Sequence, residues 1–473
     1  MSEDARLSSF FRQADMTEPV ASEPRVIPRS DHPISRARID REALKVMHRL
    51  RDEGFRAYLV GGGVRDLLLG KTPKDFDIST DAKPGELRKV FRNSRIIGRR
   101  FRLVQVFFPG GKIIEVSTFR CRSEFELNGG EVATLASDNT FGDPAEDAFR
   151  RDLTINALFY EIENFSVIDY TGGVEDLRRR LVRMVGDPDR RLIGDPVRML
   201  RAIRHAARAG FTIEAETWRA IRRHVDKLSL CPDSRLRDEL FKDLQAGASR
   251  TWAELALASG IFSRLFPFYQ QVLPESDPDQ PDLQKIVRPT PLTGLLFQLL
   301  SVVDRAVAAG KTPTEEIIFA LLLLPWAEAR FQLLASRPDR AAAYRFSRQL
   351  RNDLDEILVP LNIKRHTKEA LAVLLANLPL LLAHGAELEA AAGKKEPQWP
   401  RWLVRKGYFP RCQAFYELYL AAIAGGELPA SIAEVAAAPP LAKPKKVRAP
   451  RPGRREGRAP AMVKKKGGIF GLR

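Results

Sequence analysis

The fold of the first part of the chain is decided by the stretch Tyr58-Leu-Val-Gly-Gly-Gly-Val-Arg-Asp-Leu-Leu-Leu-Gly-Lys-Thr-Pro-Lys-Asp-Phe-Asp-Ile-Ser-Thr80. The apolar run Ala57–Val60 has the length of a strand and ends at three consecutive glycines. Residues 64–69 can form about two helical turns before Gly70 and Pro73 end them. The pattern therefore predicts a strand, a glycine turn, a short helix and a second strand.

The second strand carries Asp75 and Asp77, which alternate with Phe76 and Ile78. Successive side chains of a strand point to opposite faces, so both carboxylates are expected on one face and both apolar side chains on the other. Neighbouring carboxylates repel unless a cation lies between them. Clustered oxygen ligands suit Mg²⁺, which takes further ligands from water and substrate phosphates. We therefore predict a metal site at Asp75 and Asp77, although a solvated strand end can show the same pattern.

The glycine turn predicts a phosphate site. Gly61 and Gly62 can present backbone N–H groups to a phosphate chain, helped by the N-terminus of the helix that they open. Arg65 adds a planar positive group on that helix. Two common phosphate motifs are excluded, because a P-loop would need glycine in place of Arg65 and a dinucleotide fingerprint would need glycine in place of Asp66.

The joint pattern resembles the first motif of the nucleotidyltransferase head shared by tRNA nucleotidyltransferases and bacterial poly(A) polymerases. That motif consists of a Gly-Gly turn, Val-Arg-Asp, a glycine and Asp-x-Asp, which here are Gly61-Gly62, Val64-Arg65-Asp66, Gly70 and Asp75-x-Asp77. The resemblance covers roughly residues 38–245. It implies nucleotide transfer to an RNA 3′ end, with two Mg²⁺ ions held by Asp75 and Asp77.

A second motif, Asp147-x-x-Arg150-Arg151-Asp152, resembles the family segment that contacts the ribose and phosphates of the nucleotide. The resemblance implies that Asp147, Arg150 and Arg151 bind the nucleotide and that Asp152 assists catalysis. A charged helix face with i,i+3 and i,i+4 ion pairs is the alternative explanation. Glu115, on the second strand of a predicted hairpin, is another candidate for the third catalytic acid, and the resemblance favours Asp152.

A third motif, Asp195-Pro-Val-Arg198-Met-Leu-Arg201, resembles the family helix that reads the edge of the incoming base. Asp195 and Arg198 are three residues apart, and such residues project from one face of a helix. The resemblance implies that this pair selects adenine and that Arg201 also binds the nucleotide. The family usually has Glu immediately before this Asp, whereas this chain has Gly194, so base selectivity stays open.

Two further segments resemble family features. Arg235 and Glu239 match the last motif of the helical neck, where an i,i+4 ion pair is the simplest interpretation. Residues 96–106 resemble a segment that marks bacterial poly(A) polymerases, and they carry Arg99, Arg100 and Arg102 just before the hairpin. This basic cluster favours RNA adenylation over tRNA end repair.

The charge of the chain favours a polyanionic partner. Its 473 residues have a formal net charge of +17, and residues 441–473 hold twelve Lys or Arg against one Glu. Such a tail is expected to hold RNA phosphates in a salt-dependent manner, unless it is only a solvated segment. The scattered Cys121, Cys231 and Cys412 indicate neither disulfides nor zinc and fit a reducing cytoplasm.

The apolar runs are expected to stop short of a membrane span. The run 317–324 ends at Pro325, and the run 370–383 is broken by Asn377 and Pro379. No signal-peptide pattern begins the chain. We therefore predict a soluble protein without a membrane partner.

Strand and helix signals alternate in the first part of the chain, and strand signals nearly vanish later. We predict an α/β (α+β) nucleotidyltransferase head followed by an all-helical neck, body and tail with a disordered basic C-terminus. The expected parts are a flexible leader (1–37), the catalytic head (38–177), a helical neck with the base-recognition motif (178–265), a helical RNA-binding body (266–440) and a disordered basic tail (441–473).

These expectations describe a template-independent polynucleotide adenylyltransferase, which adds AMP from ATP to RNA 3′ ends and releases pyrophosphate. RNA 3′ ends, ATP and two Mg²⁺ ions are its expected partners, and a cytoplasmic monomer is its expected form. Two alternatives stay open: CCA addition to tRNA by the same chemistry, and a non-catalytic RNA-binding protein. The intact Asp75 and Asp77 pair argues against the non-catalytic alternative.

Overall fold

The structure is a computed structural model that describes residues 23–98, 102–121, 141–273, 290–390, 399–429 and 431–432. The predictions for Arg99, Arg100, the leader up to residue 22 and the tail 441–473 lie outside these residues. The chain divides into two units, Met1–Ala437 and Ala438–Arg473, and every described residue belongs to the first. The other predicted domain boundaries stay predictions.

The head is built on a mixed eight-stranded sheet with the order β1-β8-β7-β2-β3-β6-β5-β4. Its strands are β1 (Arg25–Ile27), β2 (Ala57–Val60), β3 (Asp77–Thr80), β4 (Ser94–Ile97), β5 (Leu103–Phe107), β6 (Ile113–Thr118), β7 (Leu158–Glu161) and β8 (Val167–Asp169). All neighbouring strands of this sheet pair antiparallel except β3 and β6, which are parallel. The predicted hairpin is confirmed by β5 and β6.

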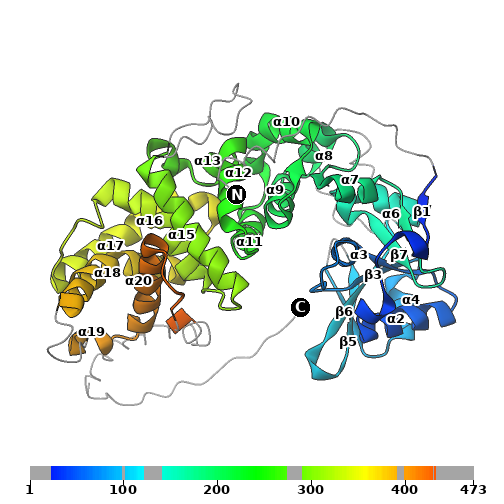
Figure 1. Cartoon of the computed structure of the whole chain (residues 1–473), viewed down its shortest axis with the longest axis horizontal. Helices are drawn as coiled ribbons and strands as arrows, with labels where there is room; N and C mark the ends of the chain where they lie inside the picture. Colours follow the sequence, from blue (N-terminus) through cyan, green and yellow to red (C-terminus); the bar gives the residue numbers. More distant parts are fainter. Residues whose placement is uncertain are drawn as a thin grey trace, which may run out of the picture. The chain divides into compact units, whose positions relative to one another are not determined.

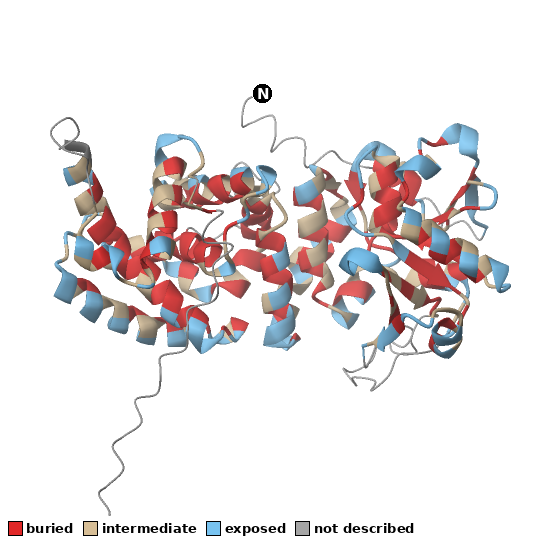
Figure 2. Ribbon diagram, turned by 90° about the horizontal axis from the view of Figure 1, so that it is seen from below, coloured by how far each residue is buried: buried red, intermediate tan, exposed pale blue. Residues whose placement is uncertain are grey.

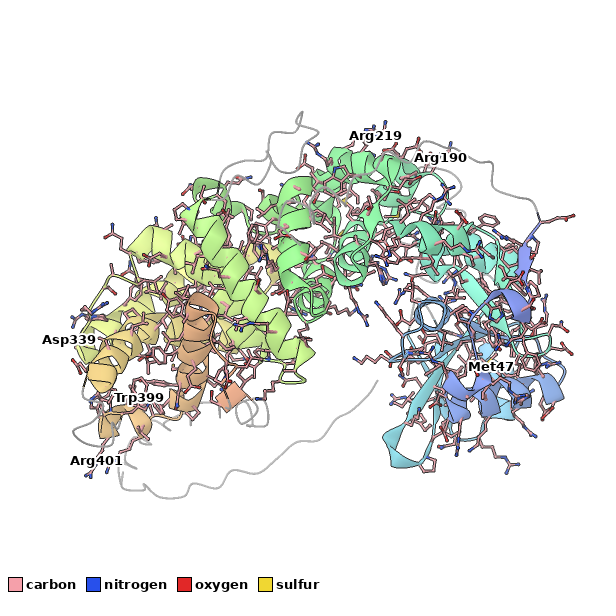
Figure 3. All side chains as sticks on the ribbon, viewed as in Figure 1. Met47, Arg190, Arg219, Asp339, Trp399 and Arg401 are labelled. Carbon is pink, nitrogen blue, oxygen red and sulfur yellow. The ribbon has the colours of Figure 1, made fainter. Side chains whose placement is uncertain are left out.

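The two faces of this sheet are covered differently because residues along each strand alternate in direction. Leu59, Ile78 and Val116 are fully buried in the main core, together with Met47 of α2 (Arg41–Asp52). Figure 1 shows α2 beside the sheet, and Figure 3 labels Met47 on it. The opposite face carries a smaller apolar cluster, which includes Val60, and the polar side chains of β3 and β6.

The segment just before α2 is ordered, so the prediction of a flexible leader is wrong for residues 23–37. β1 pairs antiparallel with β8, and Ile34 is fully buried. His32 packs its ring at 6.0 Å from the ring of Tyr160, edge to face. A strand of three residues contains too few positions for its alternation to be recognised in the sequence.

The remaining helices of the head are α3 (Gly62–Leu68), α4 (Pro84–Val90), α6 (Pro144–Arg150) and α7 (Gly173–Arg179). Later residues form α8 (Pro188–Gly194), α9 (Arg198–Ala209), α10 (Ala215–His224), α11 (Asp233–Leu244), α12 (Ser249–Ser259), α13 (Ile261–Leu265), α15 (Pro291–Ala308), α16 (Glu315–Phe331), α17 (Arg340–Ile357), α18 (Arg365–Ala390), α19 (Arg401–Val404) and α20 (Phe409–Ala424). The predicted fold class is confirmed. One exception to an all-helical neck is the parallel pair β9 (Leu181–Val182) and β10 (Thr212–Ile213).

Two helices contain a proline in their interior. α16 continues through Pro325 and α18 through Pro379, although each proline interrupts an apolar run of the sequence. A proline removes one helical hydrogen bond, and packing by neighbouring helices can maintain the helix around it. Asn377 also fits inside α18, where its side-chain Nδ2 donates to the Val373 carbonyl at 2.8 Å.

The apolar residues of these helices are used in packing. By length and composition, α15 and residues 365–388 of α18 could each cross a membrane. However, 39% of the α15 window and 61% of the α18 window are buried inside the structure, as in the core helices of compact proteins. Figure 2 shows buried residues on the faces that the helices turn toward one another.

The close packing of Gly173 in α7 against the backbone of Thr154 predicts the effect of adding a methyl group at Gly173. A Cβ at Gly173 would lie 2.2 Å from the carbonyl oxygen of Thr154, so Gly173→Ala should lower the free energy of unfolding by about 1–3 kcal/mol. Urea denaturation followed by circular dichroism measures this change. The matched control is Gly85→Ala in α4, which meets nothing within 4 Å and should be neutral or stabilising by up to about 1 kcal/mol. Equal stability of the two variants would contradict this packing.

Candidate active site

A cavity of about 670 Å³ lies between the polar face of the sheet, the loop after α6 and helix α9. Its lining contains all twelve site residues that the sequence predicted: Gly61, Gly62, Arg65, Asp75, Asp77, Asp147, Arg150, Arg151, Asp152, Asp195, Arg198 and Arg201. Three motifs that are far apart in the sequence therefore form one site.

The acidic edge of the cavity is formed by Asp77 and Glu115, which are directly paired residues of the parallel strands β3 and β6. Paired residues project on the same face, so their carboxylates are neighbours. Protein atoms around Asp77 displace water and raise its pKa to about 6, and repulsion by Glu115 and Asp75 adds to this effect. Arg151 opposes the shift. Gln105 of β5 donates to Glu115 Oε1 at 2.9 Å and thereby fixes the Glu115 carboxylate.

Asp75 lies just before β3 rather than within it, which corrects the prediction of two carboxylates on one strand. The reason is the length of β2, whose last residue Val60 pairs with Asp77 and leaves no strand opposite Asp75. Asp75 and Asp77 nevertheless line the same cavity. On the other face, Ile78 is fully buried as predicted, and Phe76 is half-buried.

The glycine turn has the conformation that its sequence requires. Gly61 has a φ of +70°, a region that favours glycine, and its N–H donates to the Leu158 carbonyl at 3.2 Å. This N–H is therefore used by the sheet. The next residues begin α3. The first N–H groups of a helix have no acceptors within that helix, so they can donate to a ligand. A Cβ at Gly61 would also lie 3.3 Å from Nη1 of Arg151, so glycine makes room for this guanidinium group.

Arg151 is the cation nearest to the turn, and Asp147 holds it in place. Asp147 is buried and accepts hydrogen bonds from Arg150 at 3.2 Å and from Arg151 at 2.8 Å. Arg151 also donates to Ser79 Oγ at 3.3 Å and stacks its guanidinium over Phe159 at 5.3 Å. The i,i+3 and i,i+4 pairs that the sequence offered as an alternative are thus present. They also aim two half-exposed arginines at the cavity.

Asp152 has a different environment from Asp77. Its Oδ2 accepts from Arg201 of α9 at 2.5 Å, and its Oδ1 accepts from the Leu153 N–H at 2.9 Å. Burial alone would raise the pKa of Asp152, but Arg201 and Arg198 hold it well below its usual value. This carboxylate therefore ties the head to α9, whereas Glu115 is the acid beside Asp77.

Arg65 is buried and is engaged by protein groups. Its guanidinium pairs with Asp66 at 2.8 Å and donates to Asn156 Oδ1 at 2.6 Å. His205 of α9 contacts both Arg65 and Asn156. Its Nδ1 lies 3.2 Å from Arg65 Nη1, and its Nε2 lies 3.2 Å from Asn156 Nδ2. Burial and the charge of Arg65 hold the pKa of His205 well below its usual value, so this imidazole is neutral.

Sequence reasoning missed Asn156 and His205. Asn156 stands four residues after Asp152, and this proximity to a motif was the available signal. His205 stands four residues after Arg201, on the same face of α9. Both residues line the cavity, so the network extends beyond the three predicted motifs.

Asp195 and Arg198, the pair predicted to read the base, lie close together, and a third residue holds Asp195. Asp195 precedes α9 and lies 3.7 Å from Arg198, while Arg235 of α11 donates to Asp195 Oδ2 at 2.8 Å. Asp195 Oδ1 is buried and has no hydrogen-bond partner within the described parts of the chain. The predicted ion pair between Arg235 and Glu239 is wrong, because Glu239 instead accepts from Arg204 at 2.6 Å.

The acidic edge fits a hard divalent cation. No group of three or more His, Cys, Asp or Glu side chains is placed to hold a metal ion in the described residues. Asp75, Asp77 and Glu115 nevertheless line one cavity, and their mutual repulsion is the force that a cation would relieve. An all-oxygen set with few protein ligands suits Mg²⁺, which keeps water and binds substrate phosphates.

Comparison with known families agrees with this geometry. Residues 57–183 match the family described as "Poly A polymerase head domain". Residues 210–273 match the family described as "Probable RNA and SrmB- binding site of polymerase A".

Curated relatives match the same part of the chain. Poly(A) polymerase I of Escherichia coli O6:H1 is 48% identical over 264 residues, which cover 54% of this chain and 57% of that protein. Poly(A) polymerase I of Haemophilus influenzae is 42% identical over 248 residues, with coverages of 51% and 55%. The CCA-adding enzyme of Bacillus pumilus is 36% identical over 225 residues, with coverages of 47% and 54%. The chain thus spans about half the length of the curated relatives it matches.

Solved structures support the fold alone. A structure titled "The structure of CCA-adding enzyme apo form II" has a TM-score of 0.51 at 22% identity and covers 84% of this chain and 96% of its own. A tRNA-processing enzyme (apo form I) has a TM-score of 0.50 at 20% identity, with coverages of 82% and 93%.

The raised pKa of Asp77 predicts a pH-dependent stability effect. Ionisation of Asp77 costs stability as the pH rises from its ordinary value of 3.8 to about 6, so Asp77→Asn should stabilise the protein above that range. After allowance for solvent screening, the gain at about pH 8 without divalent ions is about 1 kcal/mol or less, and it shrinks at about pH 5. Thermal unfolding at both pH values measures it.

The control for this prediction is Asp238→Asn on α11, whose side chain is 62% exposed. It should shift the unfolding temperature by the same amount at both pH values. Added Mg²⁺ should raise the unfolding temperature of the unchanged protein more than that of Asp77→Asn, because binding stabilises only the folded state that holds the ion. A stabilisation by Asp77→Asn that is independent of pH would contradict the assigned repulsion.

Proposed function

From the match of residues 57–183 to the poly(A) polymerase head family and the likeness to poly(A) polymerases over about half of the chain, we propose that this chain is a template-independent RNA adenylyltransferase. It adds AMP from ATP to RNA 3′ ends and releases pyrophosphate. The observation that carries this proposal is one cavity lined by the carboxylates of Asp77 and Glu115, the cation Arg151 and the half-buried Asp195. These are the groups that a phosphate chain and a base require from one nucleotide site.

The acidic edge holds the reacting groups. Two Mg²⁺ ions at Asp75, Asp77 and Glu115 would activate the RNA 3′-hydroxyl and neutralise charge on the departing pyrophosphate. Arg151, fixed by Asp147 and Ser79, places a positive charge beside the glycine turn, where the triphosphate would lie. The chain contributes mainly orientation and charge neutralisation, because phosphoryl transfer needs little covalent chemistry from protein groups.

The base is read by protein atoms in place of a template. The free Oδ1 of Asp195 is a buried acceptor that suits the exocyclic amino group of adenine, and Arg198 is a donor that suits an acceptor nitrogen of the ring. The bond from Arg235 to Asp195 supports this assignment, because it steadies the pair although Gly194 replaces the usual Glu. A buried acceptor discriminates strongly, since a base without a matching donor would leave it unpaired.

We assign the third catalytic acid to Glu115 rather than to Asp152. Glu115 is paired with Asp77 across β3 and β6, whereas both oxygens of Asp152 are occupied by Arg201 and the Leu153 N–H. Asp152 then acts as a positioning residue that fixes α9 against the head. Arg65 has a similar role through Asn156 and His205, because its donors are engaged by protein groups.

The partners of the proposed enzyme are ATP and RNA 3′ ends. A net charge of +17 favours a polyanion, and the match of residues 210–273 to a probable RNA-binding family agrees with it. Cys121, Cys231 and Cys412 form no disulfide with one another in the described residues, which suits an enzyme of RNA polyadenylation in a reducing cytoplasm.

An incorporation assay tests the proposed function. Purified protein, Mg²⁺, an unstructured RNA and each of the four nucleotides in turn should give long tails with ATP and little product with the others. Asp77→Ala should lower ATP incorporation by at least about 100-fold, because a group that stabilises transition-state charge is lost. Asp238→Asn, which is exposed on α11, should keep full activity.

The same assay separates the alternatives. A stop after a few C and A residues on tRNA alone would indicate CCA addition, which relatives such as the Bacillus pumilus enzyme perform by name. Near-normal incorporation by Asp77→Ala would refute the assignment of the acidic edge. RNA binding without incorporation of any nucleotide would indicate a non-catalytic RNA-binding protein.

The assignment of the third acid makes a separate prediction. Glu115→Gln should raise the Mg²⁺ concentration needed for half-maximal activity and shift the acidic limb of the pH profile lower, because it removes repulsion from Asp77. Asp152→Asn should leave the Mg²⁺ requirement unchanged and lower thermal stability, because it breaks a buried pair with Arg201. Activity titrations with Mg²⁺ measure both effects, and the reverse pattern would return the role to Asp152.

A further inference from the structure

A second polar and aromatic groove lies in the helical part of the chain, with different lining residues from the candidate active site. This cavity of about 680 Å³ is formed by α17, α18 and the segment around α19, and its lining includes Arg340, Tyr344, Ser347, Asn377, Trp402 and Tyr408. Figure 3 labels Asp339, Trp399 and Arg401 in this part of the molecule. Both family matches end before it, at residues 183 and 273. The groove therefore has no assigned role.

One aromatic side chain of the groove is highly accessible. Tyr344, in the second turn of α17, is 66% exposed and lines the groove. Trp402 is half-buried, and the guanidinium group of Arg340 lies over its ring at 5.2 Å. If Tyr344 served only to pack the core, its ring would be buried. An exposed ring beside a cation–π pair instead offers a surface on which a flat group can stack.

The charges around the groove are nearly all positive. Residues 337–348 contain four Arg and one Asp, and residues 399–411 contain four Lys or Arg and no acid. The single Asp339 is the N-cap of α17, where it accepts from the Ala342 N–H at 2.6 Å. Arg340 and Arg348 stand four residues before and after Tyr344, so both lie on its face of the helix.

We propose that this groove binds single-stranded RNA, with bases stacked on Tyr344 and Trp402 and phosphates held by the surrounding arginines. Aromatic rings inside a positive groove are the combination that single-stranded nucleic acids require. A duplex cannot use them, because its bases are already stacked and paired. The identity of the ligand as RNA rests on the proposed function, and the groove would hold RNA that the active site extends.

The test measures binding by the full chain to fluorescent oligo(A) with a 3′-deoxy end, which cannot be extended. Tyr344→Ala should weaken binding about 10-fold at fixed salt, because stacking of one base contributes on the order of 1–3 kcal/mol. Tyr344→Phe should bind normally, because it keeps the ring. Arg348→Ala should reduce the slope of log affinity against log salt by about 0.7, the value for one lost phosphate contact.

Two controls make the result specific. Arg49→Ala on α2 removes an exposed arginine, with 56% side-chain exposure, from a different surface and should change neither the affinity nor the salt slope.

Oligo(A) should also quench tryptophan fluorescence, and Trp402→Phe should remove most of that quenching. Trp218, Trp252 and Trp326 are buried and cannot stack with a base. The half-buried Trp399 packs edge to face against Phe409 and Tyr416, and Trp399→Phe should leave most of the quenching in place.

Three results would overturn the proposal. The first is that Tyr344→Ala leaves the affinity for oligo(A) unchanged. The second is that duplex RNA binds as tightly as oligo(A) and that Tyr344→Ala weakens both equally, and the third is that an acidic peptide of equal affinity displaces oligo(A) from the groove. The readout is independent of catalysis. If no nucleotide is incorporated but Tyr344→Ala weakens binding, the proposed function fails and the groove stands. If ATP is incorporated and Tyr344→Ala binds normally, the groove fails alone.

Discussion

The structure of the candidate site depends on the parallel pairing of β3 with β6. This pairing fixes Asp77 and Glu115 as direct neighbours, and the backbone ladder prevents the two carboxylates from moving apart. The sheet therefore maintains a local repulsion that the free side chains would avoid, and this repulsion adds to the displacement of water that raises the pKa of Asp77. Arg151 offsets part of the repulsion, and a divalent cation could offset the rest. A site that is electrostatically incomplete without its ion and substrate is suited to binding both together.

The second constraint is the coupling of the head to α9. The buried pair of Asp152 with Arg201 and the contacts of Arg65 and Asn156 with His205 join the two walls of one cavity. The acidic edge lies on the first wall, and Asp195 and Arg198 lie on or beside the second. Because buried polar networks tolerate little displacement, these contacts fix the distance between the two walls. This explains why several charged residues in the motifs contact protein groups rather than open space.

The sequence was most informative where function depends on local spacing. The glycine turn and the hairpin are set by residues close in the chain, and both were located correctly, whereas Asp75 lies just before the strand on which it was expected. Glu115 was only one of two candidates, because its closeness to Asp77 follows from a strand pairing across 38 residues of sequence. Similarly, Arg235 prefers Asp195 to the nearby Glu239, and this choice depends on how α11 packs. Local rules also failed at Pro379, where tertiary packing preserves a helix that proline alone would break.

An enzyme without a template must obtain two kinds of recognition from separate surfaces. Selection of one base needs buried acceptors and donors, which the cavity has at Asp195 and Arg198. Retention of a growing chain needs contacts that are the same for each nucleotide added, and backbone charge and base stacking meet that requirement. A surface that selects one base would release the RNA when the RNA moves by one nucleotide after each addition. A groove that stacks any base binds the RNA equally well after each such movement. The exposed ring of Tyr344 among arginines meets this second requirement, so we propose that the first cavity selects the base and that the groove of α17 and α18 retains the chain.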